Sequence, residues 1–403
     1  MNGRPLCVMI VTGEASGDDR GAGLARALKA RLGDGVRFVG VGGQRMAEEG
    51  IVSPFDIAEI SILGLLEGLF AYRRIMRRVA DTAALATRET PDIAVLIDSW
   101  GFTLRVAYAL RAHDPALPLV KYVGPQVWAT RPGRAKTLAQ AVDHLLTIHS
   151  FDAPLFEAEG LPTTFVGNAA LNVDFSHADP QRLRGNLGIG ADDPILLILP
   201  GSRPSEVKRM LPVFEDAVAR LKADRPDLAI VIPAAPTVAE TVKAMVAGWP
   251  HRAHVIEGDE AKLDAMKAAT FALACSGTVT VELALAGCPM VVGYRLDAIT
   301  AFIAMRLLLR TPYITLFNIA AKAFVAPELL QDACTGEALA REAALRLDDP
   351  AVRDAQVAAQ FAALDRMGRG GPDPADAAAD AVLKIMAARS GGQTAIVPPG
   401  GPR

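Results

Sequence analysis

Residues 271–294 read Phe-Ala-Leu-Ala-Cys-Ser-Gly-Thr-Val-Thr-Val-Glu-Leu-Ala-Leu-Ala-Gly-Cys-Pro-Met-Val-Val-Gly-Tyr. The apolar run 271–274 predicts a buried strand, and the tight turn Ser276-Gly277-Thr278 follows it. Ser276 or Thr278 can cap the helix that comes next, Gly287 ends it, and 290–293 form another strand. A strand, turn and helix in this order direct free backbone N–H groups and a helix dipole above the sheet edge, where phosphate binds well.

Glu282 lies one helical turn beyond Thr278, so the two side chains are expected to share a face of the helix. The hydroxyl can then contact a phosphate while the carboxylate accepts hydrogen bonds from a ribose. The alternative is an ordinary strand–helix corner with one solvated glutamate, and this stretch alone does not decide between them.

The composition is that of a globular protein, with 51% hydrophobic and 22% charged residues. A length of 403 residues is too great for one ordinary core and predicts two domains. The net charge of −3 gives no reason to expect a nucleic-acid partner. The four cysteines form no CxxC pair and the six histidines no HExxH motif, so we expect no metal site and a reducing cytoplasm. We see no signal peptide and no apolar run long enough, about 18 residues, to span a membrane.

Strands alternate with helices along most of the chain, which predicts an α/β fold with parallel, doubly wound sheets. The first sheet is expected to contain strands 6–11, 36–41, 93–98, 119–123 and 143–148, and the second strands 195–199, 228–233, 253–256, 271–274 and 290–293. The predicted divisions are a first domain over 1–170, a linker over 171–193, a second domain over 194–345, helices over 346–389 able to cross back to the first domain, and a disordered tail over 390–403.

The first domain offers a carboxylate where a ligand is expected. GxGxxG, GxxxxGK[ST] and GxSxG are all absent, which disfavours a nicotinamide dehydrogenase, a P-loop NTPase and a serine hydrolase. Asp98 ends a predicted strand at the edge where parallel sheets bind ligands, and a carboxylate there can act as general base on a hydroxyl. Glu14 and Ser16, after the first strand, are the neighbouring catalytic candidates. Each of the three could instead cap a helix, Ser16 above all.

The second domain contains two corners of the phosphate-binding kind. In the first, Gly201 lets the backbone approach a ligand, Ser202 is a natural cap, and Arg203 offers a planar fork suited to a diphosphate; Glu206 follows within the same motif. Together with the corner at 276–282 this suits a nucleotide diphosphate. Two ordinary capped helices are the alternative.

Residues 60–78 are more apolar than an enzyme surface requires. Their apolar part includes Leu65, Leu66 and Phe70, and it runs directly into basic residues that include Arg73, Arg74 and Arg77. This composition is typical of an interfacial helix that meets anionic headgroups, and residues 299–310 are similar. The alternative is a core helix with a basic exposed edge; two such stretches favour a peripheral membrane protein or an acylated substrate.

The chain resembles the lipid-A-disaccharide synthase family over nearly its whole length. The resemblance rests on four segments in order: 13–18 (GEASGD), 124–129 (GPQVWA), 199–206 (LPGSRPSE), and Ser276-Gly277-Thr278 followed by Glu282 and 288–295 (CPMVVGYR). It implies a GT-B architecture of two Rossmann-like domains. It also implies an inverting transfer from UDP-2,3-diacylglucosamine to the 6-hydroxyl of 2,3-diacylglucosamine 1-phosphate, which gives a β-1,6 disaccharide phosphate and UDP without a cofactor or a metal.

The same resemblance implies roles for particular residues. Asp98 is similar to the family's proposed general base, and the positions that resemble the UDP-sugar site are Arg203, Ser276, Thr278, Glu282, Asn318 and Gln331. It places the protein in the cytoplasm, peripherally associated with the inner membrane through residues 60–78, and leaves a homodimer open. Arg131 and Arg134 are candidates for the acceptor phosphate, with an ordinary solvated helix start as the alternative.

Several positions depart from the family pattern, notably Trp100-Gly101 after Asp98, Asn168, and Lys322 before Pro327. These departures leave two other functions open. One is a GT-B enzyme that uses a UDP-sugar with a different lipid acceptor, and the other is a non-catalytic relative that binds a sugar nucleotide.

Overall fold

The computed structural model describes residues 4–61, 68–296 and 311–392. The chain forms two compact units, 1–168 with 371–403 and 169–370, each built on its own six-stranded sheet. The predicted α/β fold with two parallel sheets is therefore confirmed. Among the residues predicted to face a membrane, Leu65 and Leu66 lie outside the described residues, as does 299–310. The tail expected from residue 390 is helical up to Gly392.

The N-terminal unit has a parallel sheet with the strand order β2-β1-β3-β4-β5-β6. Its strands are β1 (Leu6–Val11), β2 (Val36–Val41), β3 (Ile93–Ile97), β4 (Leu119–Tyr122), β5 (His144–Thr147) and β6 (Thr163–Phe165). Its helices are α1 (Ala15–Leu32), α2 (Gln44–Glu48), α3 (Ala58–Ser61), α4 (Gly68–Glu89), α5 (Trp100–His113), α6 (Arg134–Ala139), α7 (Ala153–Glu157) and α17 (Pro374–Gly392). The prediction lacked β6, an edge strand of three residues.

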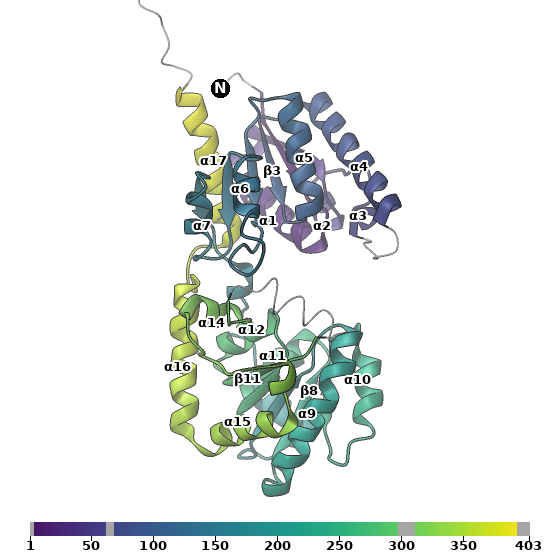
Figure 1. Cartoon of the computed structure of the whole chain (residues 1–403), viewed down its shortest axis with the longest axis vertical. Helices are drawn as coiled ribbons and strands as arrows, with labels where there is room; N and C mark the ends of the chain where they lie inside the picture. The colour runs from purple at the N-terminus through teal and green to yellow at the C-terminus, as the bar shows by residue number, and fades with distance from the viewer. Residues whose placement is uncertain (1–3, 62–67, 297–310, 393–403) are drawn as a thin grey trace, which may run out of the picture. The chain divides into compact units, whose positions relative to one another are not determined.

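An apolar core lies on each face of this sheet because successive side chains of a strand point to opposite faces. Met9 and Val11 of β1 pack into one cluster, and Val8 and Ile10 pack into the other. Helix α17 lies beside α1 on the second face (Figure 1), although the two are far apart in sequence. Arg31 of α1 joins them through ion pairs to Asp376 (2.8 Å) and Asp380 (2.6 Å) of α17.

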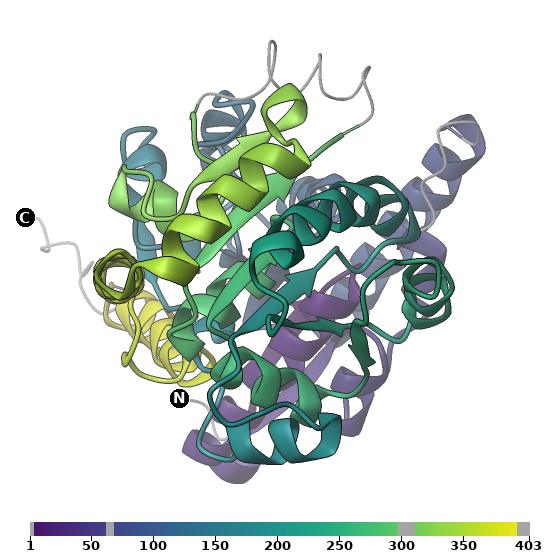
Figure 2. The same cartoon turned by 90° about the horizontal axis from the view of Figure 1, so that it is seen from below.

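The C-terminal unit has a second parallel sheet, with the order β12-β11-β10-β7-β8-β9. Its strands are β7 (Ile195–Leu199), β8 (Ala229–Pro233), β9 (His254–Ile256), β10 (Phe271–Ala274), β11 (Met290–Tyr294) and β12 (Glu328–Leu330). Its described helices include α8 (Pro180–Leu187), α9 (Pro204–Asp224), α10 (Ala239–Val246), α11 (Asp259–Ala268), α12 (Val279–Ala286), α14 (Leu316–Ala321), α15 (Gly336–Asp348) and α16 (Pro350–Arg366). Helix α15 packs along α9, and Figure 2 shows the unit from the side of these helices.

The polar stretch 171–193, interpreted from its composition as a linker, contains helix α8. The carboxylate of Asp179 caps this helix by accepting the backbone N–H of Gln181 at 2.9 Å. Arg182 then pairs with the buried Asp264 of α11 at 2.7 Å, so the segment is attached to the C-terminal unit.

In each sheet the strand order reverses at one place, between β1 and β3 in the first and between β7 and β10 in the second. Open α/β sheets bind ligands in the crevice outside the carboxyl ends of the strands at such a point. The loops that leave these strands carry Glu14 and Asp98 in one unit, and residues 201–206 and 276–278 in the other. The topology therefore brings these loop residues to one edge of the sheet in each unit.

Candidate active site

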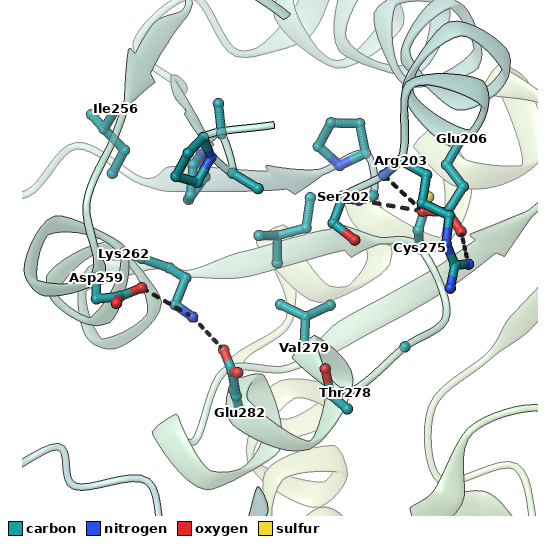
Figure 3. A pocket seen from close by; sticks show the side chains of 18 of the residues that line it. Ser202, Arg203, Glu206, Ile256, Asp259, Lys262, Cys275, Thr278, Val279 and Glu282 are labelled. Atoms are coloured by element: carbon teal, nitrogen blue, oxygen red, sulfur yellow. Dashed lines mark hydrogen bonds and ion pairs between the residues drawn. The ribbon is translucent and has the colours of Figure 1, made fainter. Parts of the chain in front are cut away.

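A cavity of about 590 Å³ opens at the carboxyl ends of β7 and β10 in the C-terminal unit. This volume lies within the ~300–1,000 Å³ range typical of small-molecule sites. The helices α9 and α12 begin at its edge, and Figure 3 shows their first residues on two sides of the same space. Eight of the predicted donor-site residues line it: Gly201, Ser202, Arg203, Glu206, Ser276, Gly277, Thr278 and Glu282.

The first corner is organised by Glu206. Its carboxylate accepts the backbone N–H groups of Ser202 and Arg203, both at 3.3 Å, and pairs with the guanidinium of Arg203 at 3.0 Å. Gly201 has φ +106°, and a Cβ there would lie 2.7 Å from Oε2 of Glu206, so only glycine fits. The side chain of Arg203 is 76% exposed, so its guanidinium is accessible to a ligand.

Ser202 does not cap α9, contrary to prediction. The N-cap position is Arg203, and Glu206 takes over the capping function from within the first turn. At the second corner Thr278 holds the N-cap position of α12 without a capping hydrogen bond from its side chain. The hydroxyl of Ser276 instead donates to the carbonyl of Ile314 at 3.5 Å. Among the described residues no side chain caps the start of α12, whose first residues line the cavity, so the positive end of the helix faces this space.

Glu282 lies one turn beyond Thr278 on α12, as predicted, and its side chain is 19% exposed. Lys262 of the neighbouring helix α11 reaches it at 2.9 Å and lies 3.9 Å from Asp259 (Figure 3). The sequence analysis did not include Lys262. The signal available for it was position, because α11 follows β9, whose carboxyl end points to the same edge.

Asn318 and Gln331 are not brought into this cavity. Asn318 is fully buried, and its amide donates to Ala326 O (2.9 Å) and Glu328 (2.8 Å) and accepts the backbone N–H groups of Val325 (2.8 Å) and Ala326 (3.1 Å). Its hydrogen-bonding capacity is therefore used within the fold. Gln331 follows β12, which is separated from β10 by β11, and adopts a left-handed φ of +50°.

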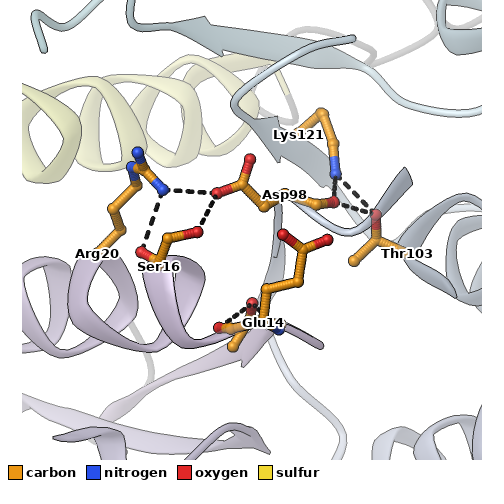
Figure 4. Close-up of polar contacts among 7 residues, drawn as sticks. Glu14, Ser16, Arg20, Asp98, Thr103 and Lys121 are labelled. Atoms are coloured by element: carbon orange, nitrogen blue, oxygen red, sulfur yellow. Dashed lines mark hydrogen bonds and ion pairs between the residues drawn. The ribbon is translucent and has the colours of Figure 1, made fainter. Parts of the chain in front are cut away.

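A second, smaller cavity of about 240 Å³ opens in the N-terminal unit, and Glu14 and Asp98 both line it. The carboxylate of Asp98 accepts hydrogen bonds from Arg20 (2.6 Å) and Ser16 (3.3 Å), both at Oδ2 (Figure 4). Among the described residues no hydrogen bond reaches Oδ1, which therefore remains available to a substrate hydroxyl. Arg20 was not predicted, although it lies one turn after Ser16 on the same face of α1.

Ser16 is not a helix cap. The helix α1 begins at Ala15, with Glu14 in the N-cap position and no hydrogen bond from a capping side chain. Ser16 therefore lies in the first turn, and its hydroxyl points to Asp98. The three catalytic candidates of the first domain therefore lie close together. Glu14 and Asp98 line the same cavity, and Ser16 contacts Asp98.

The backbone is strained where this cavity is formed. Asp98 and Ser99 have φ values of +47° and +46°, and Val123, at the end of β4, has a φ of +67°. A left-handed conformation is unusual for any residue other than glycine, and more so for a β-branched one. Such strain persists only where surrounding contacts impose it, and it is concentrated at functional sites.

Aromatic side chains complete the wall of the small cavity. Burial, with a further contribution from Arg20, lowers the pKa of His149 to about 4, so its ring is neutral at physiological pH. Its ring is stacked on Phe151 at 5.2 Å. Arg134 lies over the ring of Trp100 at 5.0 Å and lines the cavity. Arg131, the other candidate for the acceptor phosphate, is exposed and does not line it.

Within residues 4–61, 68–296 and 311–392, no group of three or more His, Cys, Asp or Glu side chains is placed to hold a metal ion. No helix within the same ranges combines the length and apolarity that crossing a membrane requires.

Two doubly wound parallel sheets, each with a ligand-binding edge at its switch point, define the GT-B class of fold. Solved structures share it. The UDP co-structure of MnaA from S. aureus covers 98% of this chain and 100% of its own, with a TM-score of 0.62 and 15% identity. The spinosyn rhamnosyltransferase SpnG complexed with thymidine diphosphate covers 94% and 100%, with a TM-score of 0.53 and 14% identity.

The chain belongs to the lipid-A-disaccharide synthase family of glycosyltransferases. The sequence profile described as Lipid-A-disaccharide synthetase matches residues 8–369. The lipid-A-disaccharide synthase of Paramagnetospirillum magneticum is 42% identical over 382 residues, which span 94% of this chain and 98% of that protein. The one of Rhodospirillum centenum is 40% identical over 386 residues and 96% of each chain. The resemblance seen in the sequence motifs is confirmed.

Proposed function

We propose that this glycosyltransferase moves diacylglucosamine from UDP-2,3-diacylglucosamine to the 6-hydroxyl of 2,3-diacylglucosamine 1-phosphate, with inversion at the anomeric carbon. The proposal rests on the chemical groups that lie at the switch points of the two sheets in this member of the family. One unit presents helix N-termini and Arg203 around a cavity of about 590 Å³, and the other presents Asp98, whose Oδ1 accepts no hydrogen bond from the part of the chain that the structure describes.

The C-terminal unit is assigned to the UDP-sugar donor. The start of α12 and the guanidinium of Arg203 suit the negative charge of a diphosphate. Glu282, held by Lys262, suits the ribose hydroxyls, and the apolar side of the cavity at Pro233 and Ile256 suits a flat pyrimidine base. The same positive groups stabilise UDP when it leaves with the electron pair of the broken glycosidic bond.

The N-terminal unit, 1–170 in the proposed division, is assigned to the acceptor and the membrane. Oδ1 of Asp98 takes the proton of the 6-hydroxyl as the oxygen attacks the anomeric carbon from the face opposite UDP. A single displacement of this kind inverts the configuration. Arg20 and Ser16 hold the other carboxylate oxygen, which fixes the direction of the base. Arg134 is the candidate for the acceptor phosphate because, unlike Arg131, it lines the cavity.

The test is a turnover assay on the purified full chain with both acylated sugars. UDP release is followed together with mass detection of a tetra-acylated disaccharide phosphate. We expect both products in equal amounts. UDP binding without the disaccharide contradicts the proposed acceptor and favours a GT-B enzyme with another one. Absence of UDP binding contradicts the donor assignment and favours a relative without this chemistry.

The exposed face of α4 supports a peripheral association with the cytoplasmic side of the inner membrane. Tyr72 is 49% exposed and Met76 is 38% exposed. Each is followed in sequence by an exposed arginine, Arg73 and Arg77 respectively, on the same face of the helix. An apolar strip flanked by arginines is the composition that binds an anionic interface. Arg74 is half-buried, with a contact of its own within the fold.

We expect Arg73→Gln combined with Arg77→Gln to weaken binding to anionic lipid vesicles about 30-fold, since each basic residue near the surface contributes ~1 kcal/mol. The measurement is co-sedimentation with vesicles that contain phosphatidylglycerol. The control is Arg45→Gln combined with Arg88→Gln, which removes two exposed arginines of the same unit elsewhere. An equal loss in the control, or no loss in the first variant, argues against this surface. Replacement of Leu65, Leu66 and Phe70 by serine tests the apolar part in the same way.

A further inference from the structure

A lysine lies in the middle of the buried strand β4, and no step proposed above uses it. Lys121 is 3% exposed, and its neighbours Leu119, Val120 and Tyr122 are equally buried. Its ammonium group donates to the backbone carbonyl of Asp98 and, at 2.7 Å, to the hydroxyl of Thr103 (Figure 4). It therefore contacts the residue proposed as general base, but through the backbone and not through the carboxylate.

The contact falls on the strained corner between β3 and α5. Asp98 and Ser99 both have left-handed φ values, which each cost free energy that other contacts must offset. The hydroxyl of Thr103 reaches the carbonyl oxygens of Asp98 (2.7 Å) and Ser99 (3.1 Å). Lys121 and Thr103 thus converge on the same carbonyl group and hold the corner from beneath.

Keeping an ammonium group in this position is unfavourable. Burial lowers the pKa of Lys121 to about 7, while the carboxylates of Asp98 and Glu14 act in the opposite direction. The cavity wall also contains Arg134 from α6 and the neutral His149 after β5, and neither carries a negative charge that would offset the ammonium group. A buried charge that costs stability is typical of a functional role.

We infer that Lys121 is a positioning residue, which holds the strained Asp98–Ser99 corner and thereby fixes the direction in which the Asp98 carboxylate enters the cavity. This inference rests on the proposed role of Asp98 as the base. A positioning role and a purely structural role predict opposite effects of Lys121 on the stability of the fold. A purely structural lysine stabilises the fold, whereas this one lowers the stability of the fold and increases turnover.

The first test is Lys121→Met, which keeps the length of the side chain and removes the charge. The hydroxyl of Thr103 still satisfies the carbonyl of Asp98, so no buried acceptor is left alone. We expect kcat to fall about 10- to 100-fold, as a small misplacement of a base does, with the Kd for UDP unchanged. We expect the melting temperature at pH 6–7 to rise by a few degrees.

The pH dependence of the free energy of unfolding distinguishes the removal of a buried ammonium group from other effects of the substitution. Below about pH 7 the ammonium form is buried at full cost. Between about pH 7 and the ordinary pKa of 10.5 the unfolded chain binds more protons than the folded one, so stability rises with pH. The advantage of Lys121→Met over the wild type is therefore expected to shrink across this window.

Three comparisons keep the test decisive. Lys136→Met removes an exposed lysine of the same unit and is expected to change neither kcat nor the melting temperature. Thr103→Val should reproduce the loss of turnover, and Thr103→Ser, which keeps the hydroxyl, should retain more of it. Hydrogen–deuterium exchange of peptides over 97–104 reads the corner without substrate, and we expect faster exchange in Lys121→Met.

The outcomes separate this inference from the proposed function. Turnover by the wild type, with lower kcat, faster exchange at 97–104 and a higher melting temperature in Lys121→Met, supports both. Unchanged kcat together with unchanged exchange overturns the positioning role. A melting temperature and a kcat that both fall in Lys121→Met also overturn it, because a purely structural lysine gives that result. If the wild type shows no turnover, the proposed function fails, and the exchange data alone decide whether Lys121 holds the corner. If Lys121→Met does not fold, the positioning role is overturned.

Discussion

Asp98→Asn is expected to lower turnover by ~10²–10⁴, the usual contribution of a general base, while UDP-sugar binding stays near that of the wild type. The amide has almost the shape of the carboxylate but cannot accept the proton of the acceptor hydroxyl. Asparagine also adopts left-handed φ values more readily than most residues, so the φ of +47° at this position should be preserved. The loss should therefore come from chemistry and not from misfolding.

The matched control for this prediction is Asp92→Asn at the other end of the same strand. Asp92 precedes β3, accepts the backbone N–H of Cys7 at 2.8 Å and pairs with Arg4, so its role is structural. We expect it to lower the melting temperature slightly and leave kcat unchanged. Turnover is measured by UDP release, and UDP binding by calorimetry. Wild-type turnover in Asp98→Asn would remove Asp98 from the mechanism and leave Glu14, which lines the same cavity, as the remaining base candidate.

The strands of the interior were predictable because parallel strands buried on both faces read as continuous apolar runs. The strands 6–11, 36–41, 195–199 and 271–274 have the bounds that were predicted. The edge strands β6 and β12 were missed, whereas β9, an edge strand that also has three residues, was predicted as 253–256. Gly287, predicted to end α12, does so with a left-handed φ of +74°.

The site was predictable where function depends on position along the chain, and unpredictable where it depends on contacts between distant segments. Glu282 and Thr278 share a helix, so their common face follows from spacing alone. Arg20 and Asp98 meet only because β1 and β3 are neighbours in the sheet, which the sequence does not state. Lys121 was missed for a local reason. The residues on both sides of it in the strand are apolar, and one charged residue did not change the apolar pattern that predicts a buried strand.

Family resemblance and local geometry differ at Asn318. Resemblance assigned it to the donor site, whereas its amide is fully engaged in the loop around Val325 and Glu328. Any effect of Asn318 on the cavity therefore passes through that loop, whose Ile314 carbonyl accepts the hydroxyl of Ser276. The predicted cap of α9 was wrong, because Glu206, within the first turn of the helix, accepts the backbone N–H groups of Ser202 and Arg203, whereas Ser202 was expected to cap the helix.

Arg203→Ala is expected to weaken UDP binding by about 1.5–3 kcal/mol, the range for a charge-assisted contact, with a smaller effect on kcat. Truncation removes the guanidinium but leaves Glu206 on the N–H groups of residues 202 and 203, so the start of α9 should keep its shape. The carboxylate of Glu206 also loses its counter-ion beside the diphosphate, which acts in the same direction.

The geometry of Arg203 can be separated from its charge with Arg203→Lys. A lysine keeps the charge but lacks the planar fork, so it should recover only part of the affinity if two phosphate oxygens are bound together. Arg220→Ala is the control, because Arg220 lies near the other end of α9 and pairs there with Asp216 at 3.0 Å. Calorimetric titration with UDP and with uridine decides the case. A loss confined to UDP locates Arg203 at the diphosphate, an equal loss for both ligands moves it to the nucleoside, and wild-type affinity for UDP argues against any contact with the donor.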